Sequence, residues 1–180
     1  MIEVNNFETF SGVKLLNQNV PEDQRGSFTK IFQKRGLLPE YSIEQVNYVK
    51  TAQKNTIRGL HYQMKEYAES KIFRVVKGSI YCLFVDLRAN HRTFATGGKC
   101  FLDKSSQAIL LPRGFATGYL TMEDHCEVLY LSDNIYNAEF EGGIRWDDPK
   151  LEFDLPNASH LLSEKDRNWA NLPNNFAGIL

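Results

Sequence analysis

The most hydrophobic stretch of the chain reads Ile72-Phe-Arg-Val-Val-Lys-Gly-Ser-Ile-Tyr-Cys-Leu-Phe-Val-Asp-Leu87. Branched and aromatic residues on either side of Gly78 predict a hairpin of two strands, 72–76 and 80–87, joined by a tight glycine turn. The second strand is apolar on both faces, so we expect it to be central and fully buried. This stretch therefore predicts a fold built from β-sheet.

Shorter strand-like runs lie on both sides of this hairpin. They predict further strands at 43–49, 98–102, 108–111, 119–121 and 127–132, with one or two edge strands in residues 1–20. An Arg25-Gly26 turn should lead into a strand through Phe28, and short helices are expected at 33–38 and from Ser163. Many short strands without a long 3.6-residue periodicity predict an all-β antiparallel sandwich or barrel.

Length and composition indicate one globular domain. The chain has 180 residues, 42% hydrophobic residues and a net charge of -1, which predicts a single domain over residues 1–180. So small a charge argues against a general nucleic-acid binder, and neither a bilayer-spanning run nor a secretory signal is visible. Cys82, Cys100 and Cys126 lie far apart and are expected to be reduced packing residues of a cytoplasmic protein.

Residues 55–63, Asn55-Thr-Ile-Arg-Gly-Leu-His-Tyr-Gln63, place a guanidinium close to an imidazole. Such a pair suits an anionic ligand with a proton transfer beside it, although a lone histidine near a strand is more often a hydrogen-bonded structural residue. Arg58 and His61 are three residues apart, so in a regular strand they would face opposite ways. For both to meet one ligand, Gly59 must carry a bend or bulge, and we expect such a distortion.

Other candidate residues each have an ordinary structural explanation. Tyr130 shares a strand face with Val128, and it could point into a barrel mouth if Leu129 and Leu131 pack between the sheets. A half-buried core tyrosine is the alternative. Lys71 would be an ordinary charge at a strand edge, and Asp166 fits a helix-capping pattern because it follows Ser163 by three residues.

Several classes of site are missing their sequence patterns. The chain has no His-x-His, Cys-x-x-Cys or His-x-x-x-His motif, so a histidine or cysteine metal site is not expected. It also has no phosphate-binding glycine loop of the Walker or Rossmann type and no nucleophile elbow for serine hydrolysis. Metal-free acid–base chemistry on an anionic ligand is the class that remains.

Seven motifs follow one another along the chain: Arg58-Gly-Leu-His-Tyr-Gln63, Lys71 before Phe73-Arg-Val-Val-Lys-Gly78, Val85-Asp-Leu-Arg88, Leu111-Pro-Arg-Gly-Phe-Ala116, Glu127-Val-Leu-Tyr130, Gly143-Ile-Arg-Trp-Asp-Asp-Pro149 and Leu162-Ser-Glu-Lys-Asp166. Their order and spacing resemble those of dTDP-4-dehydrorhamnose 3,5-epimerases, and the resemblance runs from about residue 8 to residue 170. The resemblance implies a cupin, that is, a jelly roll of antiparallel strands with a few short helices. It also implies a homodimer without metal or cofactor, whose substrate is a nucleotide-diphosphate 4-keto sugar.

The resemblance implies roles for the catalytic positions. His61 would remove the proton alpha to the ketone, and Asp166 would fix the tautomer of the imidazole. Lys71 would stabilise the enolate oxygen, and Tyr130 would return a proton from the opposite face. Inversion requires both groups, because the proton leaves from one side and arrives from the other.

The resemblance also implies the residues that bind the substrate. Two arginines would grip the phosphates, two aromatic side chains would sandwich the base, and the others match further substrate positions. The arginines are Arg25 and Arg58, and the aromatic residues are Phe28 and Tyr136. The others are Lys30, Gln45, Asn47, Thr117, Glu141 and Lys165.

Two positions depart from the family pattern. Thr117 stands where the family usually has a histidine, which motivates the hypothesis that only one of C3 and C5 is inverted. Lys30 stands where the family typically has a glutamate that contacts the nucleotide. An ammonium can only donate hydrogen bonds, which motivates the hypothesis that the base is not thymine and presents acceptors, as cytosine does in a CDP sugar.

Three other functions compete with that of a 3,5-epimerase. The chain could be a single-position epimerase on a related deoxysugar nucleotide, or a non-catalytic cupin that binds a nucleotide sugar. Retention of the four acid–base residues argues against simple binding. A metal-dependent cupin oxygenase lacks its ligands.

Overall fold

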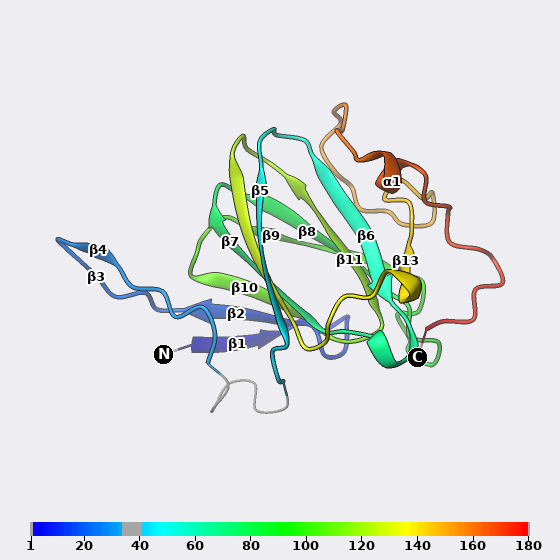
Figure 1. The fold of residues 1–180 in the computed structure, drawn as a ribbon, viewed down its shortest axis with the longest axis horizontal. Coiled ribbons are helices and arrows are strands. Elements are labelled where there is room, and N and C mark those ends of the chain that lie inside the picture. The colour runs from blue at the N-terminus through cyan, green and yellow to red at the C-terminus, as the bar shows by residue number, and fades with distance from the viewer. Residues whose placement is uncertain (1, 34–40, 180) are drawn as a thin grey trace.

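The computed structural model describes residues 2–33 and 41–179 of the chain, and its strands form two antiparallel sheets that face each other (Figure 1). In spatial order, the larger sheet contains β1 (Ile2–Asn6), β2 (Lys14–Gln18), β10 (Gln107–Leu111), β7 (Lys71–Lys77), β12 (Cys126–Ser132) and β5 (Gln45–Thr51). The smaller sheet contains β13 (Glu141–Gly143), β6 (Ile57–Gln63), β11 (Phe115–Thr121), β8 (Ile80–Asp86) and β9 (Gly97–Leu102). The predicted all-β jelly-roll sandwich is confirmed.

The strands on either side of Gly78 form as predicted, but they do not pair with each other. β7 pairs with β10 and β12, whereas β8 pairs with β11 and β9 in the facing sheet. The predicted hairpin is therefore wrong, because the turn carries the chain across the sandwich. Gly78 has a φ of +77° there, and a Cβ would lie 2.6 Å from the sulfur of Cys126.

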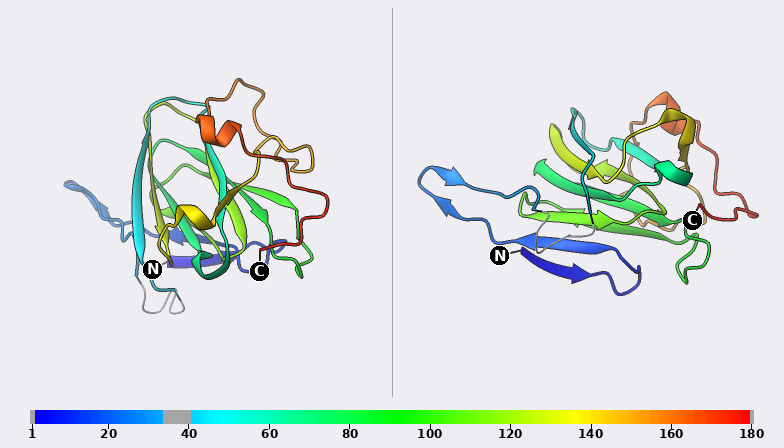
Figure 2. Two further views of the ribbon diagram at one scale, coloured as in Figure 1. Left: turned by 45° about the vertical axis from the view of Figure 1, so that its right-hand side comes forward. Right: turned by 60° about the horizontal axis from the view of Figure 1, so that its bottom comes forward.

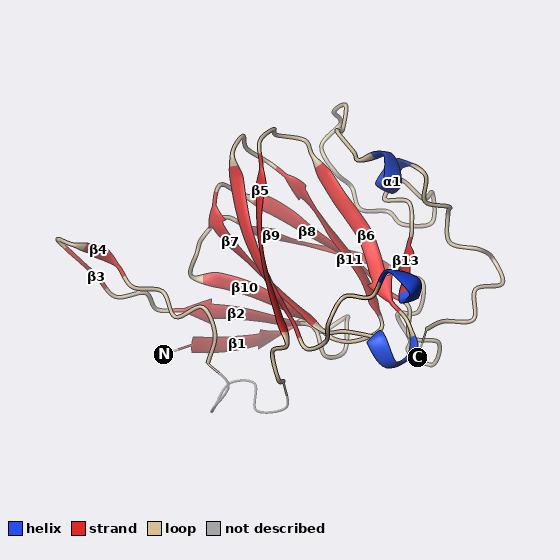
Figure 3. Ribbon diagram, viewed as in Figure 1, coloured by secondary structure: helices blue, strands red, loops and turns tan. Residues whose placement is uncertain are grey.

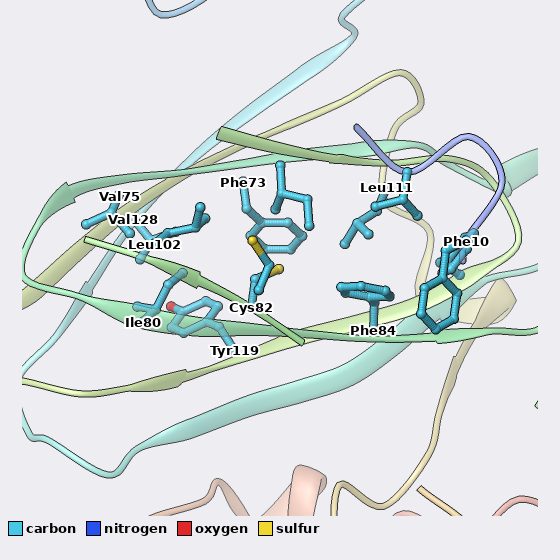
Figure 4. Close-up of a cluster of buried hydrophobic side chains, with 14 residues drawn as sticks. Phe10, Phe73, Val75, Ile80, Cys82, Phe84, Leu102, Leu111, Tyr119 and Val128 are labelled. Atoms are coloured by element: carbon cyan, nitrogen blue, oxygen red, sulfur yellow. The ribbon is translucent and has the colours of Figure 1, made fainter. Parts of the chain in front are cut away.

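The main core lies between the two sheets (Figure 4). Strand alternation sends Phe73 and Val75 inward from β7, and Ile80, Cys82 and Phe84 inward from β8. The outward face of β8 is also buried, because residues 144–172 cover it with a second apolar cluster. The prediction that this strand is central and fully buried is confirmed, apart from the partly exposed Tyr81.

Strand β12 turns Val128 and Tyr130 toward the core, whereas the arrangement considered above placed Leu129 and Leu131 there. Val128 is fully buried between the sheets, and Tyr130 packs against the same cluster. Leu131 points outward and joins a third cluster on the outer face of the larger sheet. The proposed packing of the leucines between the sheets is therefore wrong, yet Tyr130 still points into the sandwich.

The remaining elements are short (Figure 3). A projecting hairpin, β3 (Glu22–Asp23) and β4 (Gly26–Ser27), extends away from both sheets (Figure 2). Its second strand ends before Phe28, so the strand predicted through that residue is wrong. Within residues 2–33 and 41–179 there are two 3₁₀ turns, η1 (Lys65–Tyr67) and η2 (Ala138–Phe140), and one α-helix, α1 (Glu164–Arg167).

One of the two predicted helices forms, and the cysteines are buried as expected. The helix expected from Ser163 is confirmed, because the Ser163 hydroxyl caps α1 by accepting from the backbone N–H of Asp166 at 3.0 Å. The helix expected at 33–38 falls almost entirely outside the described residues. All three cysteines are buried and free. None of the helices in the described parts of the chain is long and apolar enough to span a bilayer.

Candidate active site

A cleft opens between the two sheets at one end of the sandwich. Its inner part is a cavity of about 470 Å³, and an adjoining hollow of about 330 Å³ shares four of its lining residues. The shared residues are His61, Lys71, Tyr130 and Lys165. Asp166 also lines the inner cavity, so the structure brings together all four residues predicted to be catalytic.

Strand β6 is distorted where the sequence requires it. Two of its residues, Gly59 and Leu60, stand opposite Gly118 alone on β11, which is the arrangement of a β-bulge. Gly59 has a φ of +119°, and a Cβ there would lie 2.7 Å from the Cα of Gly118. The Gly59–Leu60 peptide bond is cis. The predicted distortion is confirmed, and because of it Arg58 and His61 line the same cavity.

His61 and Asp166 form a hydrogen-bonded pair. The imidazole Nε2 lies 2.6 Å from one carboxylate oxygen, and the backbone N–H of Gly59 donates to the other at 3.3 Å. Burial acts to raise the pKa of Asp166, but the hydrogen bonds outweigh it and hold this pKa below its usual value. The Asp166 side chain is 6% exposed and that of His61 is 29% exposed, so the imidazole is the more open of the two groups.

Lys71 and Tyr130 reach the cleft from the larger sheet, opposite His61. The ammonium of Lys71 forms an ion pair at 3.0 Å with Glu69, a residue that the sequence analysis did not single out. Tyr130 packs beside Phe73, with ring centroids 5.5 Å apart. Burial raises the pKa of Tyr130, and the charge of Glu69 raises it further.

Several predicted substrate residues line the outer hollow. Glu141 accepts hydrogen bonds from the Tyr136 hydroxyl at 2.7 Å and from the Lys165 ammonium at 2.5 Å. Gln45 donates to Asn47 and accepts from the backbone of Tyr136, each at 3.0 Å. These contacts tie strand β5 to the loop that leads into η2.

Besides Lys165, two predicted substrate residues line the inner cavity. The Arg58 guanidinium donates to the hydroxyl of Thr51 at 3.1 Å, and no carboxylate within the described ranges lies in ion-pair distance of it. Thr117 is buried, and its hydroxyl donates to the backbone carbonyl of His61 at 3.5 Å.

Three predicted substrate residues are not brought to this cleft. Arg25 and Phe28 lie at the projecting hairpin and line a separate hollow. Arg25 pairs with Asp23 at 2.6 Å, and Phe28 is 69% exposed. Lys30 donates to Gln33 at 2.9 Å. A single chain therefore leaves this part of the predicted site away from the other residues.

Comparison with known proteins identifies the family. The family model of dTDP-4-dehydrorhamnose 3,5-epimerase matches residues 8–174. The chain belongs to this family. An epimerase of this name from Methanothermobacter thermautotrophicus is 35% identical over 176 residues, which cover 93% of each chain.

Solved structures of family members share the fold. An epimerase from Bacillus anthracis, crystallised with TDP and PPi bound, has a TM-score of 0.90 at 34% identity and is matched over 96% of this chain and 100% of its own. The epimerase from Legionella pneumophila, in complex with dTDP-4-keto-L-rhamnose, has a TM-score of 0.88 at 27% identity, covering 95% of this chain and 93% of its own.

Sequence reasoning missed one residue that lines the cleft, Glu69, and one that packs against His61, Trp169. Glu69 stands two residues before Lys71, a spacing that places both on one side of an extended segment. Trp169 packs edge-on to His61 with ring centroids 6.2 Å apart, and a Cβ on Gly143 would lie 2.2 Å from its ring. Among the described residues, no group of three or more potential ligands is placed to hold a metal ion.

Proposed function

We propose that the protein epimerises a dTDP-linked 4-keto-6-deoxyhexose at C3 and C5, by removing a proton on one side of each carbon and returning one on the other. The observation that carries this proposal is the placement of His61 and Tyr130 on facing sheets, lining one cavity. Membership of the family supports the choice of substrate.

His61 acts as the base. A carboxylate only accepts hydrogen bonds, so the Nε2 that contacts Asp166 carries the proton of the neutral imidazole. Nδ1 is then the basic nitrogen, and it takes the proton from the carbon next to the ketone. Asp166 holds the ring in place and stabilises the imidazolium that results.

Lys71 and Tyr130 complete the reaction. As the C–H bond breaks, its electron pair moves onto the ketone oxygen, and the Lys71 ammonium stabilises the enolate charge. The enolate then collapses and takes a proton at carbon from Tyr130, on the face opposite His61. The phenol is protonated at neutral pH, as a proton donor requires, because the pKa of a tyrosine is ordinarily about 10 and burial raises that of Tyr130 further.

Arg58 binds the diphosphate. Lys71 and Lys165 are each paired with a glutamate, whereas Arg58 contacts only a neutral hydroxyl among the described side chains. A guanidinium can contact phosphate oxygens through two N–H groups at once. The sugar therefore lies between His61 and Tyr130, with the nucleotide beyond Arg58.

The active enzyme is a homodimer in which the projecting hairpin serves the partner's cleft. The outer face of the larger sheet exposes 59% of Val46, 51% of Tyr48 and 42% of Val76, an apolar surface that a second copy would cover. Arg25 and Phe28 lie outside their own cleft. Mixing inactive Arg25→Ala and His61→Asn variants should restore activity, because hybrid dimers contain one complete site. A monomeric protein in analytical ultracentrifugation, or no recovery of activity when the variants are mixed, would contradict this arrangement.

Lys30 and Thr117 motivate two hypotheses that differ from this proposal, namely a nucleotide other than dTDP and inversion at only one carbon. Turnover of dTDP- and CDP-linked sugars should be compared directly, since a clear preference for dTDP would refute the CDP hypothesis drawn from Lys30. Deuterium entering at both carbons would refute single-position inversion. The cytoplasmic location also stays a prediction.

Incubation of the protein with a dTDP-linked 4-keto-6-deoxyhexose in heavy water tests the proposed function. NMR should show deuterium at C3 and C5 together with inverted product. Binding of the sugar nucleotide without any exchange would contradict the enzyme and favour a non-catalytic binding protein.

A further inference from the structure

Glu69 is a buried carboxylate inside the cleft. Its side chain is 8% exposed and lies 3.0 Å from the ammonium of Lys71, itself 12% exposed. The backbone between them is fixed, because Ser70 donates to the Asp133 carboxylate at 2.6 Å and Lys71 opposes Ser132 in the ladder of β12. The backbone therefore holds the two side chains next to each other.

Burial of this pair is costly to folding and needs a reason. Two charges removed from water lose hydration that their mutual attraction only partly restores, so a buried pair is poor evidence of added stability. Glu69 and Lys71 line the same hollow as Tyr130. We propose that Glu69 is a positioning residue of the epimerase, which fixes the Lys71 ammonium and supplies the negative charge that keeps Tyr130 a proton donor; this inference rests on the proposed function.

The first effect acts through Lys71. A lysine side chain is a flexible stem with three donors on its ammonium. Contact with Glu69 uses one donor and holds the stem in one position, which leaves two donors for the oxygen of the ketone and enolate. An unfixed ammonium would spend part of its time away from that oxygen, and the rate would fall with little change in binding.

The second effect acts through Tyr130. Burial is the main reason that the pKa of Tyr130 is raised, the charge of Glu69 comes next, Glu141 adds to it, and Arg58 opposes it. The ionisable groups that line the cleft around the phenol, besides Glu69, are Arg58, His61, Tyr62, Lys71, Tyr119, Tyr136, Glu141, Lys165 and Asp166. Removing the charge of Glu69 should lower the pKa of Tyr130, so the phenol would lose its proton at a lower pH.

The test compares Glu69→Gln with two other variants. Glu69→Gln keeps the shape and removes the charge, and Glu69→Asp keeps the charge on a shorter stem. Glu66→Gln makes the same charge change on the exposed surface of η1 and serves as the matched control. We expect Glu69→Gln to lower kcat about tenfold with KM within about threefold, and to move the alkaline limb of kcat to lower pH. Glu69→Asp should restore most of the limb, and Glu66→Gln should match the wild type.

Solvent exchange separates this role from a structural one. At an alkaline pH where Tyr130 is ionised in Glu69→Gln but still protonated in the wild type, His61 of the variant still removes the proton, whereas Tyr130 has none to return. The ratio of deuterium exchange to inversion should therefore rise in heavy water. If folded Glu69→Gln has the exchange ratio and pH profile of the wild type, the inference is overturned. The proposed function then still holds, because the wild type is active. If Glu69→Gln does not fold, Glu69→Asp with a pH profile unlike the wild type would overturn it. A wild type without exchange would instead refute the proposed function.

Discussion

Asp86 and Asp166 are both buried carboxylates with a cationic or basic partner, but they do different things. Asp86 is fully buried and accepts from the Arg88 guanidinium at 2.8 and 2.7 Å and from the Thr93 hydroxyl at 2.6 Å. Asp166 accepts from His61, which is 29% exposed and faces the cavity. In each case hydrogen bonds outweigh burial and lower the pKa of the carboxyl group.

The difference lies in the partner. An arginine keeps its proton at any ordinary pH, and the guanidinium of Arg88 is covered by the ring of Phe115 at 4.6 Å. A histidine can give up and take a proton near neutral pH. A buried carboxylate therefore indicates an active site only when its partner can change protonation state and reaches a cavity.

The largest effect is expected for His61→Asn. The amide cannot act as a base, so kcat should fall by roughly 10⁴-fold, at the upper end of what acid–base catalysis supplies. Circular dichroism and thermal unfolding should stay close to the wild type, because the residue is partly exposed. Activity within tenfold of the wild type would contradict the assignment of the base.

The opposite result is expected for Asp86→Asn. Loss of this carboxylate leaves the buried guanidinium without its counter-charge, which should lower the free energy of unfolding by about 3 kcal/mol. Urea unfolding measures this loss. Activity per folded molecule should stay within about twofold of the wild type, and a selective loss of kcat would show that Asp86 also serves the site.

A smaller effect is expected at the phosphate-binding end of the cleft. If the guanidinium contacts the diphosphate before and during reaction, as proposed, Arg58→Ala should raise KM about tenfold, roughly 1.4 kcal/mol, with a lesser change in kcat. Steady-state kinetics at low salt provides the comparison. A fall in kcat at constant KM would place Arg58 at the reacting carbon instead.

The smallest effect is expected in the acid dependence of stability, compared between Asp86→Asn and the wild type. The pKa of Asp86 is lowered from an unfolded value of 3.8, so its stabilisation is fully present above that value and is lost as pH falls through the folded pKa. The free energy of unfolding should therefore fall less steeply below about pH 4 in Asp86→Asn than in the wild type. Urea unfolding at a series of acidic pH values measures both slopes, and equal slopes would contradict the lowered pKa.

The strands could largely be predicted from sequence, whereas their partners could not. Alternation and apolar content at 72–76 and 80–87 are local properties, and both strands formed. Whether the Gly78 turn closes a hairpin or crosses to a facing sheet depends on where the next strands lie. The same limit applies to Tyr130: alternation correctly grouped it with Val128, but it could not say which face of the strand meets the core.

The site was predictable where the sequence carries a spacing or motif. Gly59 could be identified because Arg58 and His61 have opposite strand parity and only a distortion reconciles them. Glu69 stood in a segment that reads as polar, and its burial appears only when β12 packs beside it. Trp169 reaches His61 across Gly143 of strand β13, a contact that no local pattern encodes.

Tyr130→Phe in heavy water tests the central claim most directly, because it separates proton removal on one face from proton return on the other. With a dTDP-linked 4-keto-6-deoxyhexose, the wild type should give deuterium at C3 and C5 in inverted product. Tyr130→Phe should still exchange deuterium through His61 but return it to the same face, leaving the sugar uninverted. Inversion by Tyr130→Phe at the wild-type rate would contradict the claim that these two residues act from opposite sides of the substrate.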